Sequence, residues 1–402
     1  MVTVSSNKGD YFKTALRLFC NGLKFRYLRL IGAPLKPRVL SLAVTNRCNS
    51  HCIMCHIWKK AREQPDIKSL ETPKDEIIDL LSRPLFSELV ELDLTGGEPH
   101  LRDDLADIVI EIGELKKRFL PRLRSIIVAS NGLLPQRVIS NYQKISEGLK
   151  DTGIDIVSVS SIDGIGQTHD RIRGTKSAFE LATQTINGLL ELRKACPRFL
   201  AGIKTTILPD NVNELGAILD FALERELFHI ISSAYFTETR FRNLDTREEL
   251  ALSPQQREEA LKFYSRDELK TSYFYQTARD VSIAGKKQWL CAALYNYMFI
   301  DYDGKVYPCE IMSAPIGNIK EQAIEDIWNG SLARYWRRKI GKWACCRNCH
   351  EPGAIRYSAY DGGFSYLKFL VKSGRHKFNE TFYQEGFAKY SGRQRQRRTE
   401  QP

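Results

Sequence analysis

Short apolar runs alternate with longer helical patterns between about residues 38 and 236. The runs that predict strands are 39–45, 90–96, 124–130, 155–161, 201–207 and 229–236. Segments between them, such as 103–117 and 177–194, repeat apolar residues at steps of three and four, which predicts helices. Near-continuous apolar strands that alternate with helices indicate an α/β fold with a parallel sheet, either open or closed into a barrel.

The pattern changes after about residue 285. Short aromatic-rich runs flank an Asp-Gly turn at 303–304, and a predicted short helix and a group of cysteines follow. These features predict a small second domain. The expected division is an N-terminal extension (1–37), a core barrel (38–240), a connecting helical segment (241–284), a cysteine-rich domain (285–355) and a basic, aromatic tail (356–402).

Residues 11–31 predict a basic amphipathic helix. Its apolar positions recur at steps of three and four and share one face: Phe12, Leu16, Phe19, Leu23, Tyr27 and Leu30. Lys13, Arg17 and Lys24 lie beside that face, and Arg26 interrupts it. Such a helix fits an anionic membrane surface, and the same pattern fits a helix packed across the open edge of a barrel. The sequence leaves both interpretations open.

Charge and composition narrow the function classes. The 402 residues carry a net charge of +12, but residues 1–40 hold +7 and residues 361–402 hold +5, so the middle is formally neutral. A nucleic-acid-binding protein would more often line its body with positive charge, so nucleic acid is not an expected partner. No window is apolar enough to span a membrane, and the first residues do not match a secretory signal. We expect a cytoplasmic protein, with peripheral membrane contact left open.

Three cysteines follow the first predicted strand, in the segment TNRCNSHCIMCHIW. Cys48, Cys52 and Cys55 form a Cys-x3-Cys-x2-Cys array. Three thiolates within eight residues suit an iron–sulfur cluster, and a set of three leaves one iron open for catalysis. A zinc site that borrows His51 or His56 is the alternative on spacing alone.

Polar residues and glycines follow the next predicted strands, where a barrel gathers its chemistry. They are Gly96, Gly97 and Glu98 after the second strand, Asn131 after the third, and Ser161 and Arg173 after the fourth. Glycines allow close backbone approach, a carboxylate can receive an ammonium group, and an arginine can hold a carboxylate. Each of these residues taken alone is more often part of a turn or a solvated helix start.

A second group of cysteines lies near the C-terminus. Cys291 and Cys309 open with a Cys-x12-Gly-x4-Cys spacing, and Cys346 and Cys349 close with Cys-x2-Cys. Cys345 is an alternative to Cys346. On spacing alone these four thiolates fit structural zinc as well as a cluster.

The cysteine array followed by GGEP at the end of the next strand resembles the radical S-adenosylmethionine (SAM) superfamily. The resemblance covers about residues 38–236 and implies a partial (β/α)6 TIM-type barrel. It implies that Cys48, Cys52 and Cys55 bind a 4Fe–4S cluster whose open iron chelates SAM. It further implies that reduction of the cluster cleaves SAM to a 5′-deoxyadenosyl radical, which abstracts hydrogen from substrate.

The same resemblance implies roles around SAM. Gly96, Gly97 and Glu98 would receive the methionine amino group, and Ser161 and Arg173 match positions that contact ribose or carboxylate, with Asn131 nearby. Met54 matches the apolar position that packs near adenine.

The C-terminal cysteines resemble the SPASM/twitch extension, in its shorter form. That resemblance implies a second, auxiliary 4Fe–4S cluster held by Cys291, Cys309, Cys346 and Cys349. We therefore expect an oxidoreductase that acts on a sugar, an aminoglycoside-like or a lipid-linked compound, fed by an external one-electron donor such as flavodoxin or ferredoxin. A maturase that modifies a peptide or protein side chain, and a non-catalytic iron–sulfur or zinc scaffold, are the alternatives. No residue is assigned as general acid or base; Asp163 and Glu310 are polar candidates near the expected site.

Overall fold

The computed structural model describes residues 8–283, 285, 287, 289–347 and 349–391. The chain divides into two compact units, which are described separately. The barrel unit comprises Lys36–Glu259 and Tyr297–Gly330, and the helical unit comprises Met1–Leu35, Ala260–Asn296 and Ser331–Pro402.

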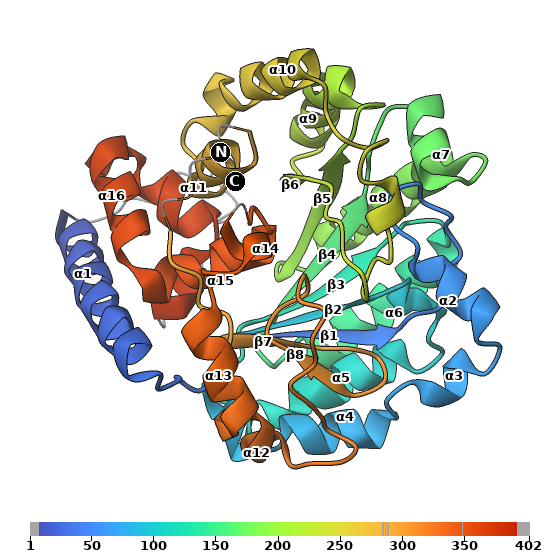
Figure 1. The fold of residues 1–402 in the computed structure, drawn as a ribbon. Coiled ribbons are helices and arrows are strands. Elements are labelled where there is room, and N and C mark those ends of the chain that lie inside the picture. Colours follow the sequence, from blue (N-terminus) through green and yellow to red (C-terminus); the bar gives the residue numbers. More distant parts are fainter. Residues whose placement is uncertain (1–7, 284, 286, 288, 348, 392–402) are drawn as a thin grey trace. The chain divides into compact units, whose positions relative to one another are not determined.

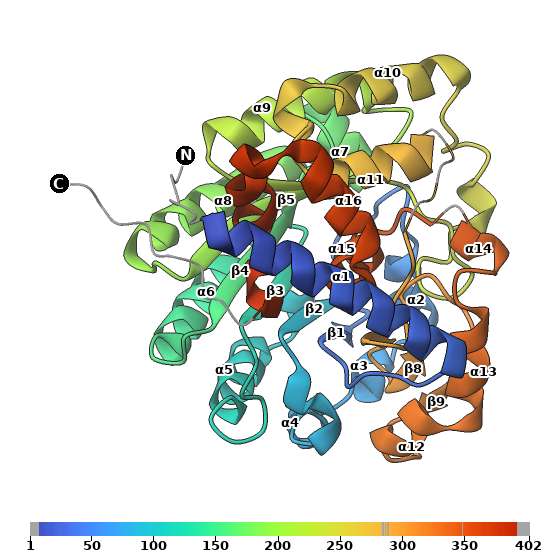
Figure 2. The same ribbon diagram turned by 90° about the vertical axis from the view of Figure 1, so that its left-hand side faces the viewer.

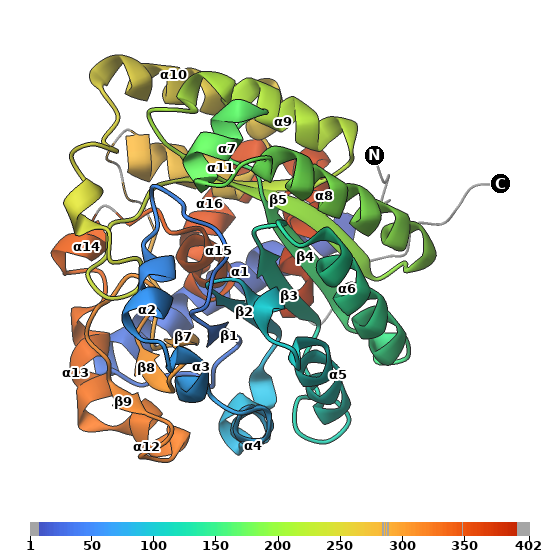
Figure 3. The same cartoon turned by 90° about the vertical axis from the view of Figure 1, so that its right-hand side faces the viewer.

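Six parallel strands form the centre of the barrel unit (Figures 1 and 3). They are β1 (Val39–Thr45), β2 (Glu91–Gly96), β3 (Ser125–Ser130), β4 (Asp155–Ser161), β5 (Phe199–Ile207) and β6 (Phe228–Ser233). Each pairs in parallel with the next, so their carboxyl ends lie at one edge. This arrangement confirms the predicted α/β fold with a partial TIM-type barrel.

Helices cover the outer face of this sheet, as Figure 3 shows for α4, α5, α6 and α8. The α-helices of the barrel unit are α2 (Ile57–Glu63), α3 (Ile67–Leu70), α4 (Lys74–Leu81), α5 (Leu105–Leu115), α6 (Pro135–Leu149), α7 (Gln167–Arg173), α8 (Ala178–Ala195), α9 (Leu215–Glu224) and α12 (Ile324–Asn329). The helix α10 (Pro254–Tyr264) crosses the boundary between the units. Apolar residues at helical spacing, such as Ile108, Val109 and Ile112 of α5, are fully buried against the sheet.

Three short strands extend the same sheet beyond β1. Strand β7 (Tyr297–Ile300) pairs in parallel with β1, and β8 (Lys305–Tyr307) and β9 (Gly317–Asn318) follow in antiparallel order. Gly304 has φ +86° at the turn between β7 and β8, a conformation that favours glycine. The sequence predicts residues 285–355 as one segment, whereas the backbone pairing with β1 places 297–330 in the barrel unit. The boundaries of the functional domains stay a prediction.

The helical unit packs its helices around aromatic side chains. Its α-helices are α1 (Lys8–Ile31), α11 (Tyr273–Ala278), α13 (Ser331–Lys339), α14 (Ala344–Arg347), α15 (Pro352–Gly362) and α16 (Phe364–Ser373). Figure 2 shows α1 lying along α15 and α16. Among the described helices, none combines the length and apolarity that crossing a membrane requires.

The face of α1 that packs is not the predicted apolar one. Thr14, Leu18, Gly22 and Phe25 are buried, and the ring of Phe364 lies so close to Gly22 that a Cβ there would overlap it. The predicted face is exposed instead; its side chains are Phe12, Leu16, Phe19, Leu23, Tyr27 and Leu30, which are 46% to 84% exposed. The helix thus has two apolar faces, and its neighbours in the helical unit cover the narrower one.

Candidate active site

Strand β1 delivers the three N-terminal cysteines to the carboxyl edge of the sheet. All seven residues of β1 are buried, and the loop that follows reaches its first cysteine, Cys48, three residues after the strand ends. Thr45 donates a hydrogen bond to Glu71, which also receives the Arg47 guanidinium at 2.8 Å. The first turn of the loop is therefore anchored before the first cysteine.

Two other segments of the barrel unit clamp this cysteine loop. On one side, the amides of His51 and Ile53 donate to the carbonyls of Arg173 and Ile172, both at 3.0 Å. The other side is held by the turn at residues 237–243. There the Asn243 side chain donates to the Met54 carbonyl at 2.7 Å, and the His56 amide donates to the Phe241 carbonyl at 2.8 Å. The conformation of the loop is thus fixed by hydrogen bonds to its backbone from the segments that follow β4 and β6.

The thiols of this loop lie close enough to act on one another. Burial, and then the charge of Cys52, raise the pKa of Cys48 well above its usual value, and the same two causes raise that of Cys55 to about 12. Thiols become thiolates when they ligate a metal. A bound cluster would therefore stabilise the charged form that burial disfavours in these cysteines.

Positive charge offsets the thiolates that such a cluster needs. Arg173 donates to Cys52 Sγ at 3.6 Å, and Arg173 and Arg240 both favour the charged form of Cys55. Among the described residues, no three His, Cys, Asp or Glu side chains converge as they would around a single metal ion. The set of thiols and arginines fits a wider iron–sulfur core.

Glu98 links the ends of β2 and β3. Its carboxylate is 1% exposed and accepts hydrogen bonds from the amides of Asn131 (2.6 Å) and His100 (3.1 Å) and from the Ser130 hydroxyl (3.2 Å). Burial raises the pKa of Glu98 to about 7. Since a carboxylate offers about four acceptor positions, one remains for a further donor such as an ammonium group.

Asn131 joins this carboxylate to the cysteine loop. Its side-chain amide donates to the Asn49 side chain at 2.7 Å and reaches Cys48 Sγ at 3.9 Å. The structure therefore brings Glu98 and Asn131 together with Cys48, as the sequence predicts.

Gly97 is required by close backbone approach. Its amide donates to the Thr45 carbonyl at 2.8 Å, and a Cβ there would overlap the carbonyl of Arg47. Gly96 has φ +148°, and a Cβ there would overlap the Thr45 carbonyl. Both glycines pack the end of β2 onto the cysteine loop.

We expect Gly97→Ala to lower the free energy of unfolding by about 1–3 kcal/mol, the usual cost of overpacking. It should also weaken SAM binding, because the Arg47 segment must move. Urea unfolding and SAM titration, both anaerobic, measure the two effects. Gly9→Ala is the matched control, since nothing lies within 4 Å of its added Cβ. A Gly97→Ala protein as stable as the control would contradict the expectation.

Arg173 forms a buried ion pair with Asp163. Arg173 is 7% exposed and Asp163 is fully buried. Burial opposes the charge of Arg173, but Asp163 and Cys52 outweigh it and raise its pKa. Asp163 also accepts the Thr206 amide at 2.6 Å, so it has a structural role and is a poor candidate for proton transfer.

The two remaining predicted residues lie on neighbouring segments. Ser161 ends β4 and is paired with Lys204 of β5. The Met54 side chain is 8% exposed and packs with Ile172, Leu208 and other apolar residues in one cluster.

Arg240 is a candidate that the sequence reasoning missed. It lies in the turn after β6 and is 7% exposed. Its guanidinium stacks over Phe299 at 4.3 Å and lies 3.5 Å from the Glu310 carboxylate. Glu310 in turn accepts the Ser41 hydroxyl at 2.6 Å. The position of Arg240 after the sixth strand, at the sheet edge where the other candidates lie, is the feature of the sequence that could have identified it.

The C-terminal cysteines are divided between the units. In the helical unit, burial and then Cys291 raise the pKa of Cys349 to about 12, so these two thiols lie near each other. Cys346 is buried, whereas Cys345 is exposed. Cys309 belongs to the barrel unit, two residues after β8.

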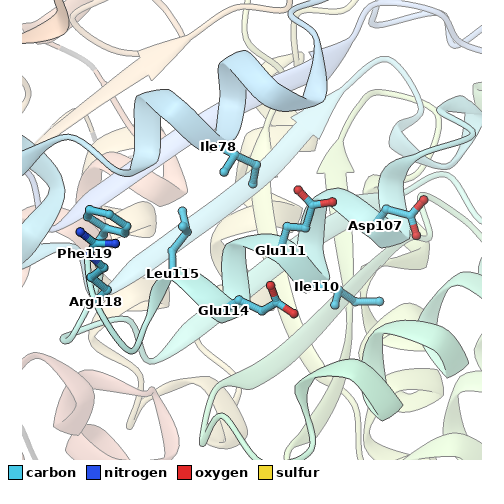
Figure 4. A pocket seen from close by; sticks show the side chains of 8 residues that line it. All are labelled: Ile78, Asp107, Ile110, Glu111, Glu114, Leu115, Arg118 and Phe119. Carbon is cyan, nitrogen blue, oxygen red and sulfur yellow. The ribbon is translucent and has the colours of Figure 1, made fainter.

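A hollow of about 590 Å³ on the outer helices shares no residue with these candidates (Figure 4). Its lining comes from α4, α5 and the turn after α5: Ile78, Asp107, Ile110, Glu111, Glu114, Leu115, Arg118 and Phe119. Lys74 pairs with Glu111 at its side. We attach no chemistry to it.

Comparison with known proteins agrees with this geometry. Residues 42–222 match the radical SAM superfamily, and residues 291–350 match SPASM, an iron–sulfur cluster-binding domain. The chain is 27% identical to the AdoMet-dependent heme synthase of Methanosarcina barkeri (strain Fusaro / DSM 804), over 83% of this chain and 95% of that protein. It is 26% identical to the sporulation killing factor maturation protein SkfB of Bacillus subtilis (strain 168), over 81% and 71%.

A solved structure shares the fold. Native anSMEcpe with bound AdoMet aligns with a TM-score of 0.52 and 16% identity, covering 88% of this chain and 98% of that one. The cysteine loop, the two domain matches and this fold lead to one conclusion. The chain belongs to the radical SAM superfamily, whose cofactors are SAM and a 4Fe–4S cluster, and it carries a SPASM-type domain for auxiliary iron–sulfur binding.

Proposed function

We propose that the protein is a radical SAM oxidoreductase that removes hydrogen from a small molecule. Cys48, Cys52 and Cys55 hold the SAM-binding cluster in this proposal. The observation that carries it is the clamped cysteine loop, with Glu98 and Arg173 hydrogen-bonded around it within one unit.

The residues around the loop divide the work of binding SAM. Glu98 keeps an acceptor position for the methionine ammonium, and Asn131 orients that carboxylate through its amide. Arg173 holds Cys52 and places its positive charge beside the cluster. When bound there, SAM and a reduced cluster would supply the radical chemistry that breaks an unactivated C–H bond, which no side chain provides. The apolar cluster around Met54 excludes water from one side of the loop.

We assign the auxiliary cluster to Cys291, Cys309, Cys346 and Cys349. The burial of Cys346 and the exposure of Cys345 support the choice between them. Four cysteines leave no coordination position for substrate, which suits electron relay. Net oxidation would then balance, because SAM cleavage would consume one electron and the substrate would give one back as it loses a proton.

Anaerobic reconstitution with flavodoxin or ferredoxin as the one-electron donor tests this function. We expect fractions of a small-molecule extract to stimulate the release of 5′-deoxyadenosine. We also expect product to form without net consumption of the reductant. Two external electrons consumed per product would contradict the relay. Stimulation by no small-molecule fraction would contradict the substrate class.

Peptide modification is the second candidate, favoured by similarity to a protein named for maturation of a killing factor. Stimulation of 5′-deoxyadenosine release by the peptide fraction of the extract, and not by compounds below about 1 kDa, would replace the small-molecule proposal.

We further propose that α1 contacts an anionic membrane surface. The exposed apolar face defined above is flanked by Lys13, Arg17 and Lys24. Apolar side chains beside basic ones complement the interface of an anionic bilayer. Deleting residues 1–31 is a poor test, because Leu18 and Phe25 belong to the core of the helical unit.

We expect Leu16→Glu together with Leu23→Glu to abolish flotation with phosphatidylcholine vesicles that contain 30% phosphatidylglycerol. Both leucines are at least half exposed, so the free energy of unfolding should change by less than about 0.5 kcal/mol. Leu223→Glu, on an exposed position of α9, is the control. If the double variant floats as well as the control, the membrane proposal is wrong. A wild-type dimer that the same double variant dissociates would assign the face to a second copy instead.

A further inference from the structure

Arg240 holds buried hydrogen-bond donors for which the described part of the chain offers no acceptor. A guanidinium carries five N–H donors and cannot lose its charge in a protein. Arg240 Nη2 lies 3.3 Å from the Thr95 hydroxyl and 3.5 Å from Glu310. Its Nε and Nη1 atoms are buried and, among the described residues, have no hydrogen-bond partner.

Specific hydrogen bonds and a ring contact fix the position of Arg240. The turn at 237–243 is closed by the Phe241 amide donating to Thr237 Oγ1 (2.8 Å) and the Thr237 amide donating to Asn243 Oδ1 (3.0 Å). Stacking on Phe299 then holds the guanidinium plane against β7, beside β1. Burying a charged donor without a hydrogen-bond partner costs free energy. A fold that holds such a donor in place therefore indicates that a ligand supplies the acceptor.

Charge around Arg240 favours an anion. Glu310 supplies one negative charge and is itself hydrogen-bonded to Ser41. Lys204 is a second cation that acts on the same carboxylate. Two cations therefore face one carboxylate on this side of the sheet.

We propose that Arg240 binds an oxyanion of the substrate, a carboxylate or a phosphate, through one of its unpartnered donors, Nε or Nη1. This inference rests on the proposed function and names the substrate class of the same site. The anchored group would lie next to the cysteine loop, because the Arg240 turn is hydrogen-bonded to Met54 and His56. Arg240 is thus a substrate-binding residue, and Glu310 competes with the anion for its charge.

Anaerobic calorimetry of reconstituted protein with saturating SAM tests the proposal. Succinate is the carboxylate probe and glycerol 3-phosphate the phosphate probe, with succinamide and glycerol as uncharged counterparts. Wild-type protein should bind at least one anion and neither counterpart. Arg240→Gln should weaken that binding about tenfold to a hundredfold, as loss of a charge-assisted hydrogen bond does. Arg240→Lys should weaken it less.

Two further variants separate this role from a structural one. Glu310→Gln, which removes the competing carboxylate, should tighten anion binding even if Arg240→Gln folds poorly. Arg122→Gln, at an exposed ion pair with Glu88, should change nothing. Wild-type protein that binds neither anion, or binds it as tightly as Arg240→Gln, contradicts the proposal, as does weaker binding by Glu310→Gln.

The same samples also test the proposed function, through a separate measurement. Release of 5′-deoxyadenosine by wild-type protein without substrate reports SAM cleavage. Its absence would reject the radical SAM activity, whereas normal release by wild-type protein together with unchanged anion binding in Arg240→Gln rejects only the anchor. A lost cluster signal in Arg240→Gln, with anion affinity unchanged, would show that Arg240 serves the cluster alone.

Discussion

Cys52→Ala is expected to reduce 5′-deoxyadenosine release to that of a mixture without protein. Cys52 is 7% exposed and is the thiol to which both Arg173 and Ser50 are hydrogen-bonded. A cluster that has lost one of three protein ligands cannot keep the geometry that leaves one iron for SAM. Reconstituted protein should fall from about eight irons per chain toward about four, since the auxiliary cluster is retained.

Cys196→Ala is the control for that prediction. Cys196 ends α8 and is far in sequence from both cysteine groups. The control should keep both its iron and its 5′-deoxyadenosine release. Full activity in Cys52→Ala would instead support the alternative of a scaffold without catalysis, or a different set of ligands.

Arg173→Ala is expected to lower the free energy of unfolding by about 3–5 kcal/mol, the cost of leaving a buried charge without its partner. Asp163 is fully buried and would lose the only cation to which the structure pairs it in the described residues. The effect should also reach the active site, because the cysteine loop hydrogen-bonds to the backbone beside Arg173. Anaerobic urea unfolding and SAM titration measure the two losses.

Arg171→Ala is the matched control on the same helix. Arg171 is exposed, and within the described part of the chain its side chain hydrogen-bonds to Thr168, at 3.3 Å. Its loss should cost less than about 0.5 kcal/mol. Arg173→Lys should recover part of the stability, because it keeps the charge but not the two-pronged geometry. Equal stability of Arg173→Ala and Arg171→Ala would show that the ion pair contributes nothing.

The barrel strands were predictable because each is a short, nearly continuous apolar run. The predicted strands at 39–45 and 155–161 coincide with β1 and β4. The predicted run 229–236 extends three residues beyond β6, because Ala234 to Phe236 are apolar but leave the sheet to lead into the Arg240 turn. The pattern of apolar residues predicts which positions are buried, and buried positions continue past the last residue that pairs with β5.

Other features depend on contacts that no local pattern carries. The clamp on the cysteine loop joins Met54 to Asn243 and His51 to Arg173, across sequence separations of more than 120 residues. The exposure of the predicted face of α1 depends on Gly22, which lets Phe364 pack on the opposite side. Strand β7 joins the barrel sheet through pairing with a strand more than 250 residues earlier.

Arg240 shows most clearly which features a sequence does not predict. Its place after the sixth strand was visible in the sequence, but its burial and its unpaired donors were not. Glu310 was noted only as a polar residue beside Cys309; the structure gives it a partner on β1 and another after β6.

Electron paramagnetic resonance of the reduced, reconstituted protein tests the central claim most directly. The claim is that Cys48, Cys52 and Cys55 hold a cluster with an iron open to SAM. We predict a 4Fe–4S signal that shifts on addition of SAM in wild-type protein, and no SAM-dependent shift in Cys52→Ala. A wild-type spectrum that SAM leaves unchanged would contradict the account.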